Sequence, residues 1–191
     1  MKEKRIIELR AQDSAESQSL TLEGVPIVFE TPTTIKDSAG DYIEIIKRGA
    51  LDETDLSDVR LLYNHDLSKV PLARTPKTMT LTKDSAGLKM RATLPNTETG
   101  REVYEAVKRG DLSGMSFAFT VPQGGDSFDP QTNTRTIYKI NKLYECSIVP
   151  FPAYAETSVE ARSEISESMK RYQARKNLKI LANKILMNSE V

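Results

Sequence analysis

Two stretches decide the expected fold: Asp111-Leu-Ser-Gly-Met-Ser-Phe-Ala-Phe119 and Leu143-Tyr-Glu-Cys-Ser-Ile-Val149. Both are rich in apolar, aromatic and β-branched residues, as β-strands are. Alternation along an extended chain separates the small side chains of the first stretch from the bulky ones. The small face carries Gly114, Ser116 and Ala118; the bulky face carries Met115, Phe117 and Phe119. We therefore predict that the bulky face builds core, whereas the small face leaves room above Ser116.

Strand signals continue over the first 150 residues. Short segments rich in β-branched and aromatic residues are separated by Gly, Pro, Asn and Asp. This spacing favours a barrel or a sandwich. The expected strands span residues 5–9, 20–29, 42–46, 59–63, 79–82, 88–94, 115–121, 136–140 and 143–149.

Other segments depart from this pattern. A helix is expected over residues 98–109, because Val103 and Val107 lie four apart and Gly110 can end the helix. A short helical turn is expected around 51–58, and a long hairpin loop over 122–133. Beyond 155, charged residues, Ser, Ala and Leu replace the β-branched ones. This predicts a main domain over 1–155 and a helical tail over 156–191.

Composition excludes several classes of protein. The chain of 191 residues has 27 Lys and Arg and 27 Asp and Glu, so no net field attracts nucleic acid or an acidic membrane. A single cysteine excludes an intrachain disulfide framework. The sequence contains no cluster of Cys and His residues that could bind a structural zinc ion. No dinucleotide or phosphate-binding glycine motif occurs. No run approaches the ~20 apolar residues that span a bilayer. We expect a soluble cytosolic protein without cofactor or metal.

His65 is the leading candidate for proton transfer. It is the only histidine, and it stands in Leu61-Leu62-Tyr63-Asn64-His65-Asp66, where an apolar strand meets a polar loop. Histidine exchanges protons near neutral pH without a strong environmental perturbation. A surface or structural histidine is the alternative interpretation.

A serine nucleophile needs a base and a third group that orients the base. Ser116 is preferred to Ser113, because Ser113 falls on the bulky side of the strand. The alternative interpretation of the small face around Ser116 is that it packs closely against another strand. Cys146 is a weaker alternative, because buried cysteines on strands are usually inert.

Glu145 is the best placed orienting residue. Alternation puts Glu145, Ser147 and Val149 on one face of their strand and Tyr144, Cys146 and Ile148 on the other. A carboxylate among apolar neighbours needs a partner, which a Lys or Arg could also supply. Asp111 is the alternative third member, and Asp66 is a weaker one. Arg74, which follows the histidine closely, could donate hydrogen bonds at an oxyanion site or lie at the surface.

In order along the chain, these motifs resemble those of the prohead maturation proteases of tailed bacteriophages. The resemblance covers about residues 5–155. It rests on Asn64-His65-Asp66, Pro71-Leu-Ala-Arg-Thr75, Gly87-Leu88, Arg109-Gly-Asp-Leu-Ser-Gly-Met-Ser-Phe-Ala-Phe119 and Leu143-Tyr-Glu-Cys-Ser-Ile-Val-Pro-Phe-Pro-Ala153.

The resemblance implies a fold similar to that of the herpesvirus assembly proteases (assemblins). This fold is mainly β with peripheral helices (α+β), a closed or partly open antiparallel barrel. It implies a serine endopeptidase that cleaves the scaffold region of the major capsid protein, and itself, inside the prohead in the host cytoplasm. Ser116 would be the nucleophile, His65 the base and Glu145 the orienting residue. The herpesvirus relatives use a second histidine there, which this chain lacks. The partners implied are the capsid protein, its scaffold region and the enzyme itself; a homo-oligomer stays open.

Two other functions compete with this one. A non-enzymatic capsid scaffold or assembly protein of the same descent would keep Ser116 and His65 as structural residues. A cytosolic peptide-binding β-barrel is the third interpretation. Cleavage of the capsid precursor by the purified chain would separate both of these from a protease.

Overall fold

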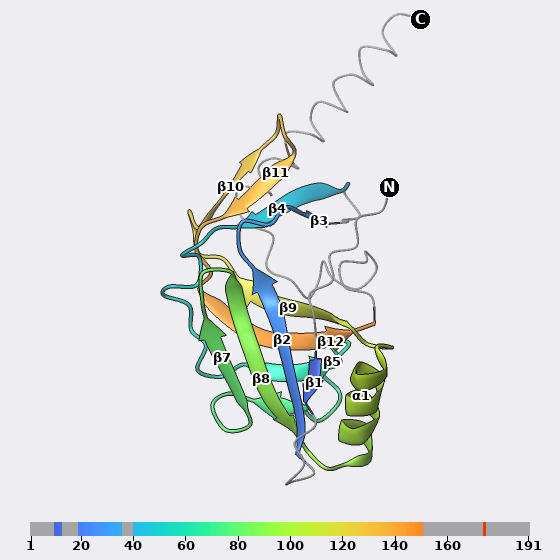
Figure 1. Ribbon diagram of the computed structural model, residues 1–191. Helices are drawn as coiled ribbons and strands as arrows, with labels where there is room; N and C mark the ends of the chain where they lie inside the picture. Colours follow the sequence, from blue (N-terminus) through green and yellow to red (C-terminus); the bar gives the residue numbers. More distant parts are fainter. Residues whose placement is uncertain (1–9, 13–18, 36–39, 151–173, 175–191) are drawn as a thin grey trace, which may run out of the picture.

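The computed structural model describes residues 10–12, 19–35, 40–150 and 174 (Figure 1). The described residues form three four-stranded sheets and one α-helix. The first sheet has the order β1-β2-β8-β7, and every neighbouring pair in it is antiparallel. Its strands are β1 (Arg10–Gln12), β2 (Leu20–Val28), β7 (Met79–Lys83) and β8 (Gly87–Leu94).

The second sheet has the order β10-β11-β4-β3. Its strands are β3 (Thr33–Ile35), β4 (Tyr42–Ile46), β10 (Asp126–Asp129) and β11 (Thr134–Ile137). The β10–β11 hairpin joins this sheet through β11, which runs parallel to β4.

The third sheet has the order β6-β5-β12-β9 and carries the candidate site. Its strands are β5 (Arg60–Tyr63), β6 (Ala73–Arg74), β9 (Gly114–Thr120) and β12 (Lys142–Val149). The central strand β12 is parallel to β5 and antiparallel to β9. Segments distant in sequence therefore become neighbours across β12.

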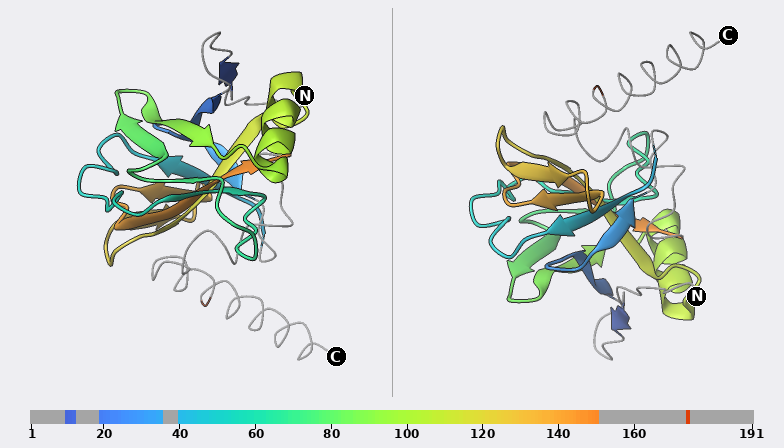
Figure 2. Two further views of the ribbon diagram at one scale, coloured as in Figure 1. Left: turned by 90° about the horizontal axis from the view of Figure 1, so that it is seen from below. Right: turned by 90° about the horizontal axis from the view of Figure 1, so that it is seen from above.

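Helix α1 (Glu98–Arg109) has the bounds that the sequence predicts. Thr97 caps its start by accepting a hydrogen bond from the Gly100 N–H at 3.2 Å. Gly110 ends it at φ 83°, a left-handed conformation that glycine adopts without a steric penalty. α1 lies beside β1 and β2, opposite the β10–β11 hairpin (Figure 2). Lys108 and Arg109 in the last turn complement the helix dipole.

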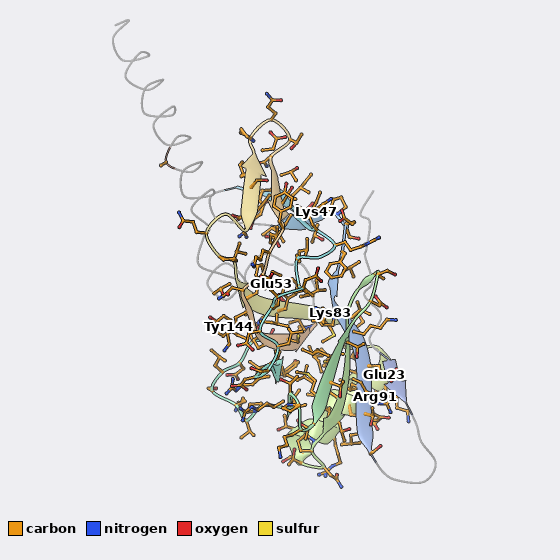
Figure 3. All side chains as sticks on the ribbon, turned by 90° about the vertical axis from the view of Figure 1, so that its left-hand side faces the viewer. Glu23, Lys47, Glu53, Lys83, Arg91 and Tyr144 are labelled. Atoms are coloured by element: carbon orange, nitrogen blue, oxygen red, sulfur yellow. The ribbon has the colours of Figure 1, made fainter. Side chains whose placement is uncertain are left out.

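One hydrophobic cluster joins the three sheets and the helix. Leu22 and Leu88 enter it from the first sheet, Ile137 from the second and Ile148 from the third, all at most 1% exposed. Val103 on α1 closes the same cluster. Several ion pairs lie at the surface, namely Lys47–Glu30, Arg91–Glu23 and Lys139–Glu53; Figure 3 labels Lys47, Arg91, Glu23 and Glu53. Burial of this apolar cluster is the main force holding the sheets together.

Several expectations about the fold need correction. The sheets do not close into a barrel, and two parallel pairs interrupt the expected antiparallel arrangement. Residues 51–58 form successive turns, not a helical turn. The expected loop 122–133 contains β10, and β9 pairs with β12 instead of with the next strand along the chain. The short β3 and β6 were not predicted, because three and two residues carry too little pattern.

Two expected segments lie outside the described residues. These are the strand over 5–9 and, apart from residue 174, the helical tail over 156–191. The division into a main domain and a tail at residue 155 therefore stays a prediction. No helix in the described ranges is long and apolar enough to cross a membrane.

Candidate active site

The third sheet brings the three predicted site residues to one region. His65 follows the end of β5, Ser116 lies in β9, and Glu145 lies in the β12 strand between them. Ser116 is the direct cross-strand partner of Ser147, and Glu145 is that of Ala118. Directly opposed residues project from the same side of a sheet. The predicted faces are therefore confirmed for both strands as far as Ser116, Glu145 and Ser147 are concerned.

A β-bulge between Leu143 and Glu145 gives the carboxylate its direction. Leu143 is paired with Phe119, whereas Glu145 is paired with the next residue, Ala118, so Tyr144 is the extra residue. Simple alternation would put Leu143 and Glu145 on one face. The bulge instead leaves Leu143 in the core, turns Glu145 to the site face, and leaves Tyr144 45% exposed (Figure 3). The expected grouping of Tyr144 with Cys146 and Ile148 was wrong for this reason.

The His65 ring contacts the Glu145 carboxylate directly. Nδ1 of His65 lies 2.7 Å from Oε1 of Glu145, and the two side chains are only 11% and 7% exposed. The other carboxylate oxygen, Oε2, accepts a hydrogen bond from the Ser147 hydroxyl at 2.5 Å. Hydrogen bonds to an ionised acceptor are short and strong, more so away from water. The carboxylate is therefore held at both oxygens.

An unusual turn presents the His65 ring to this carboxylate. Asn64 and His65 have φ values of 53° and 58°, in the left-handed region that few residues other than glycine adopt. The Asn64 N–H donates to the Ile148 carbonyl at 2.9 Å, and the His65 N–H donates to Ser147 Oγ at 3.1 Å. Left-handed conformations outside glycine concentrate at functional sites, where the surrounding structure holds them. Here β12 supplies that support.

Ser116 lies in β9, which flanks β12 on one side, whereas β5 flanks β12 on the other. Ser116 is 5% exposed, and its neighbours Met115 and Phe119 anchor β9 in the core. Among the described residues, no hydrogen bond joins Ser116 Oγ to the His65 ring. The His65–Glu145 contact is formed, and Ser147, the cross-strand partner of Ser116, is hydrogen-bonded to both of its members.

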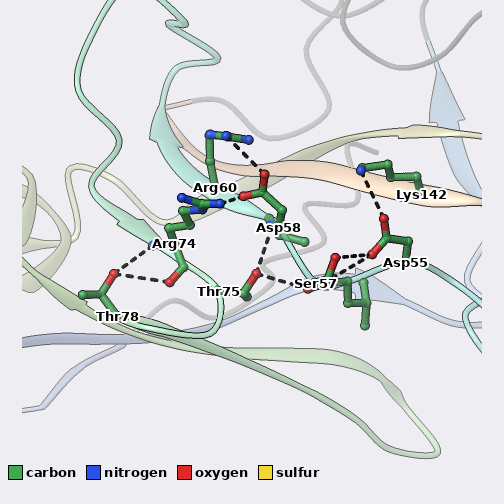
Figure 4. A network of polar contacts seen from close by, with 10 residues as sticks. Asp55, Ser57, Asp58, Arg60, Arg74, Thr75, Thr78 and Lys142 are labelled. Carbon is green, nitrogen blue, oxygen red and sulfur yellow. Dashed lines mark hydrogen bonds and ion pairs between the residues drawn. The ribbon is translucent and has the colours of Figure 1, made fainter.

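The alternative site residues lie elsewhere. Arg74 binds Asp58 at 2.6 Å at the outer edge of the sheet, in a polar network shown in Figure 4. Its strand, β6, is three strand spacings from β9, which is about 14 Å. Asp111 forms an exposed pair with Arg109 at 3.2 Å. Within the residues that the structure describes, no hydrogen bond or ion pair joins Arg74 or Asp111 to Ser116 or His65, and both have other partners.

Asp66 and Cys146 have other partners. Asp66 accepts hydrogen bonds from the Ser68 N–H and hydroxyl, which closes the loop after His65. Cys146 is fully buried on the core face of β12. Its burial, together with the nearby charge of Glu145, raises the pKa of its thiol well above the usual value. A thiol of that kind is a poor nucleophile.

Sequence reasoning placed Ser147 on the site face but assigned it no role. The signal that could have found it is the Glu-x-Ser spacing in the part of β12 where the other residues are Cys146, Ile148 and Val149, since a buried hydroxyl needs partners. Within the described ranges, no group of three or more His, Cys, Asp or Glu side chains could hold a metal ion.

Comparison with known families matches residues 5–172 to the caudovirus prohead serine proteases. The chain belongs to this family. The match continues beyond residue 155, where the motifs quoted from the sequence end. No curated protein and no solved structure gives a significant match to the prohead protease chain. Family membership implies a serine peptidase of bacteriophage capsid maturation.

The geometry suits the chemistry of a prohead serine protease. Nδ1 of the His65 ring is hydrogen-bonded to Glu145, so Nε2 is the ring nitrogen that can exchange a proton with a hydroxyl. A buried carboxylate on Nδ1 fixes the tautomer and stabilises an imidazolium. The residue across from Ser147 on the same sheet face is a serine, as such a reaction requires.

Proposed function

We propose that Ser116, His65 and Glu145 are the catalytic triad of a serine endopeptidase that cleaves the scaffold region of the major capsid protein and also cleaves itself. It acts in the assembling prohead within the host cytoplasm. The contact of 2.7 Å between His65 and Glu145, on the face that Ser116 shares, carries this proposal. Membership in the prohead serine protease family supports it.

In the proposed reaction, His65 Nε2 takes the proton of Ser116 as Oγ attacks a peptide carbonyl. The tetrahedral intermediate collapses, and His65 returns the proton to the leaving amine. Water then attacks the acyl-enzyme with His65 again as base, which releases the carboxylic acid and regenerates the hydroxyl. The Glu145 carboxylate stabilises the imidazolium at Nδ1.

Burial strengthens this arrangement. Ser116 and Glu145 are each 5% exposed, so a substrate that seals the site leaves the His65–Glu145 contact poorly hydrated. Electrostatic stabilisation of developing charge is larger where water is excluded. The mechanism requires Ser116 Oγ to reach Nε2 when substrate binds, since catalytic hydrogen bonds often tighten only in the complex.

We also propose that residues 156–191 dock the enzyme onto scaffold or capsid subunits. Glu156, Glu160, Glu164 and Glu167 come first, Lys170, Arg171, Arg175, Lys176, Lys179 and Lys184 follow, and the sequence pattern adds an apolar stripe. Deletion of this segment should reduce incorporation into shells while a peptide substrate is still cleaved. Incorporation at the wild-type level would reject the docking role.

The experiment that tests the protease function is co-expression of the chain with its capsid precursor. The wild type should produce defined fragments, and Ser116→Ala should leave the precursor intact while the shells still assemble. Ser113→Ala is the matched control, because it removes a nearby hydroxyl outside the triad. A fluorophosphonate probe should label the wild type and Ser113→Ala, but not Ser116→Ala. Fragments in the presence of folded Ser116→Ala would reject Ser116 as nucleophile. Shells without cleavage by the wild type would favour a non-enzymatic assembly protein.

A further inference from the structure

Ser147 lies at the centre of the candidate site and is completely buried. Its hydroxyl makes two hydrogen bonds, to Oε2 of Glu145 at 2.5 Å and from the main-chain N–H of His65 at 3.1 Å. Its strand position is directly opposite Ser116. No other described hydroxyl contacts both members of the His65–Glu145 pair.

The direction of both hydrogen bonds follows from the groups involved. A main-chain N–H can only donate, and an ionised carboxylate can only accept. The single proton of Ser147 must therefore point to Glu145, while its oxygen accepts from His65. Since that proton is already used, Ser147 is not the attacking hydroxyl of this site. It lies on the Nδ1 side of the ring, whereas a nucleophile must meet Nε2.

These two bonds fix separate parts of the site. The bond to Oε2 holds one oxygen of Glu145, so Oε1 stays directed at the histidine ring. The bond from the His65 N–H holds the main chain at φ 58°, a conformation that needs external support. One hydroxyl thus sets both the orientation of the carboxylate and the position of the residue that carries the ring.

We infer that Ser147 is a positioning residue that aligns His65 and Glu145. Its effect on turnover rests on the proposed protease function, but its effect on the ring does not. Removing the hydroxyl should let the carboxylate rotate and the turn relax. A misplacement of about 1 Å in such a site can lower the rate about 100-fold.

The direct test is NMR of the Ser147→Ala protein labelled with ¹⁵N. His65 is the only histidine, so every imidazole signal belongs to it without further assignment. The wild type should show a downfield Nδ1 proton, held by Glu145 and protected from exchange. In Ser147→Ala this proton should broaden or exchange at least about tenfold faster as the carboxylate loses its anchor. Ser147→Thr, which keeps a hydroxyl, should restore the signal if the added methyl is accommodated.

Thr75→Val is the matched control. Thr75 also has a buried hydroxyl that joins two main-chain groups, the Val59 N–H and the Leu56 carbonyl, but it lies outside the site. Its replacement should lower stability and leave the histidine signal unchanged. If Ser147→Ala fails to fold, Ser147→Thr is compared with Ser147→Val. These two side chains have nearly the same volume, so a difference in the histidine signal reports the effect of the hydroxyl alone.

Kinetics separates this inference from the proposed function. If the wild type cleaves its substrate, Ser147→Ala should lower kcat about 10-fold to 100-fold with KM nearly unchanged, because Ser147 does not touch substrate. An unchanged Nδ1 proton and an unchanged kcat in folded Ser147→Ala would overturn the positioning role and leave the protease function standing. A changed Nδ1 proton in a chain whose wild type cleaves nothing would support the positioning role and reject the protease function.

Discussion

The sheet β10-β11-β4-β3 and the sheet β6-β5-β12-β9 each contain a buried cluster of charged side chains. In the former, Arg135 on β11 binds Glu44 at 3.0 Å and Asp126 at 2.7 Å, and all three side chains are at most 6% exposed. In the latter, Glu145 binds His65 at 2.7 Å. Both clusters place a nitrogen-containing side chain against buried carboxylate, but arginine and histidine differ in chemistry.

Arginine remains charged at any physiological pH, whereas histidine gains and loses its proton. Burial alone would lower the pKa of Arg135, but the charges of Glu44 and Asp126 outweigh it and the pKa is raised. That cluster can hold strands together but cannot exchange protons. In the described part of the chain, Nη2 of Arg135 has no hydrogen-bond partner. The difference shows that burial of charged side chains alone does not identify an active site, because the Arg135 cluster has no member that exchanges protons near neutral pH.

Within the two buried clusters, the largest effect is expected from Glu145→Gln. The amide keeps the shape but loses the charge that stabilises the imidazolium, and it favours the wrong tautomer. We expect kcat to fall roughly 10³-fold to 10⁴-fold, as in other triads that lose their carboxylate charge. Cleavage kinetics and thermal unfolding together measure this. Asp111→Asn is the control, and a comparable loss there instead would transfer the orienting role to Asp111.

The opposite outcome is expected from Arg135→Met. It leaves Glu44 and Asp126 buried without their cation, which should lower the free energy of unfolding by about 3–5 kcal/mol. Urea denaturation measures this change, and kcat per folded molecule should stay at the wild-type value. Lys47→Met, which breaks an exposed pair, should cost far less. An Arg135→Met protein with wild-type stability and a low kcat would contradict the assignment of a structural role to the Arg135 cluster.

A smaller effect is expected from Arg74→Ala. Arg74 is 58% exposed and pairs with Asp58 at the edge of the sheet. Surface pairs of this kind add little to stability. We expect kcat to stay within about twofold of the wild type, since a group that binds no oxyanion lacks the large rate contribution of such donors. A 100-fold loss of kcat would place Arg74 in the oxyanion site after all.

The smallest effect concerns a charge outside both clusters. In the β7–β8 turn, the hydrogen bond from Lys89 and those from the Ala86 and Gly87 N–H groups lower the pKa of Asp84 from 3.8 to about 2. A carboxyl with a depressed pKa stabilises the fold above its unfolded pKa and loses that effect as the pH falls through the folded pKa. The difference in Tm between wild type and Asp84→Asn should therefore be present at pH 5 and should shrink between about pH 4 and pH 2. A difference that is constant over this range would show that the charge of Asp84 is not its cause.

The sequence allowed much of the secondary structure to be predicted. Helix α1 was predicted with its observed bounds because its caps and its apolar spacing agree. The long strands β2, β8 and β12 were found because their apolar patterns persist over eight or nine residues. Their grouping into three separate sheets was not predictable, since pairing depends on contacts between distant segments.

The candidate site could be predicted only in part, because it also depends on contacts between distant segments. The faces of Ser116 and Glu145 followed from alternation, and the family motifs pointed to His65. The bulge at Tyr144, the left-handed turn at His65 and the two hydrogen bonds of Ser147 did not follow. Each depends on how β12 fits between two strands whose positions one sequence does not specify.

The central position of β12 also dictates when the site can come into existence. Glu145 lies 80 residues after His65, and its strand must enter between β5 and β9. During synthesis β5 and β9 emerge first, and closing so long a separation is a slow, late event in folding. Any growing or truncated chain that stops before residue 142 lacks both Glu145 and the strand that joins the other two. Under the proposed triad, the chain is therefore inert as a protease until this part of its own synthesis is complete.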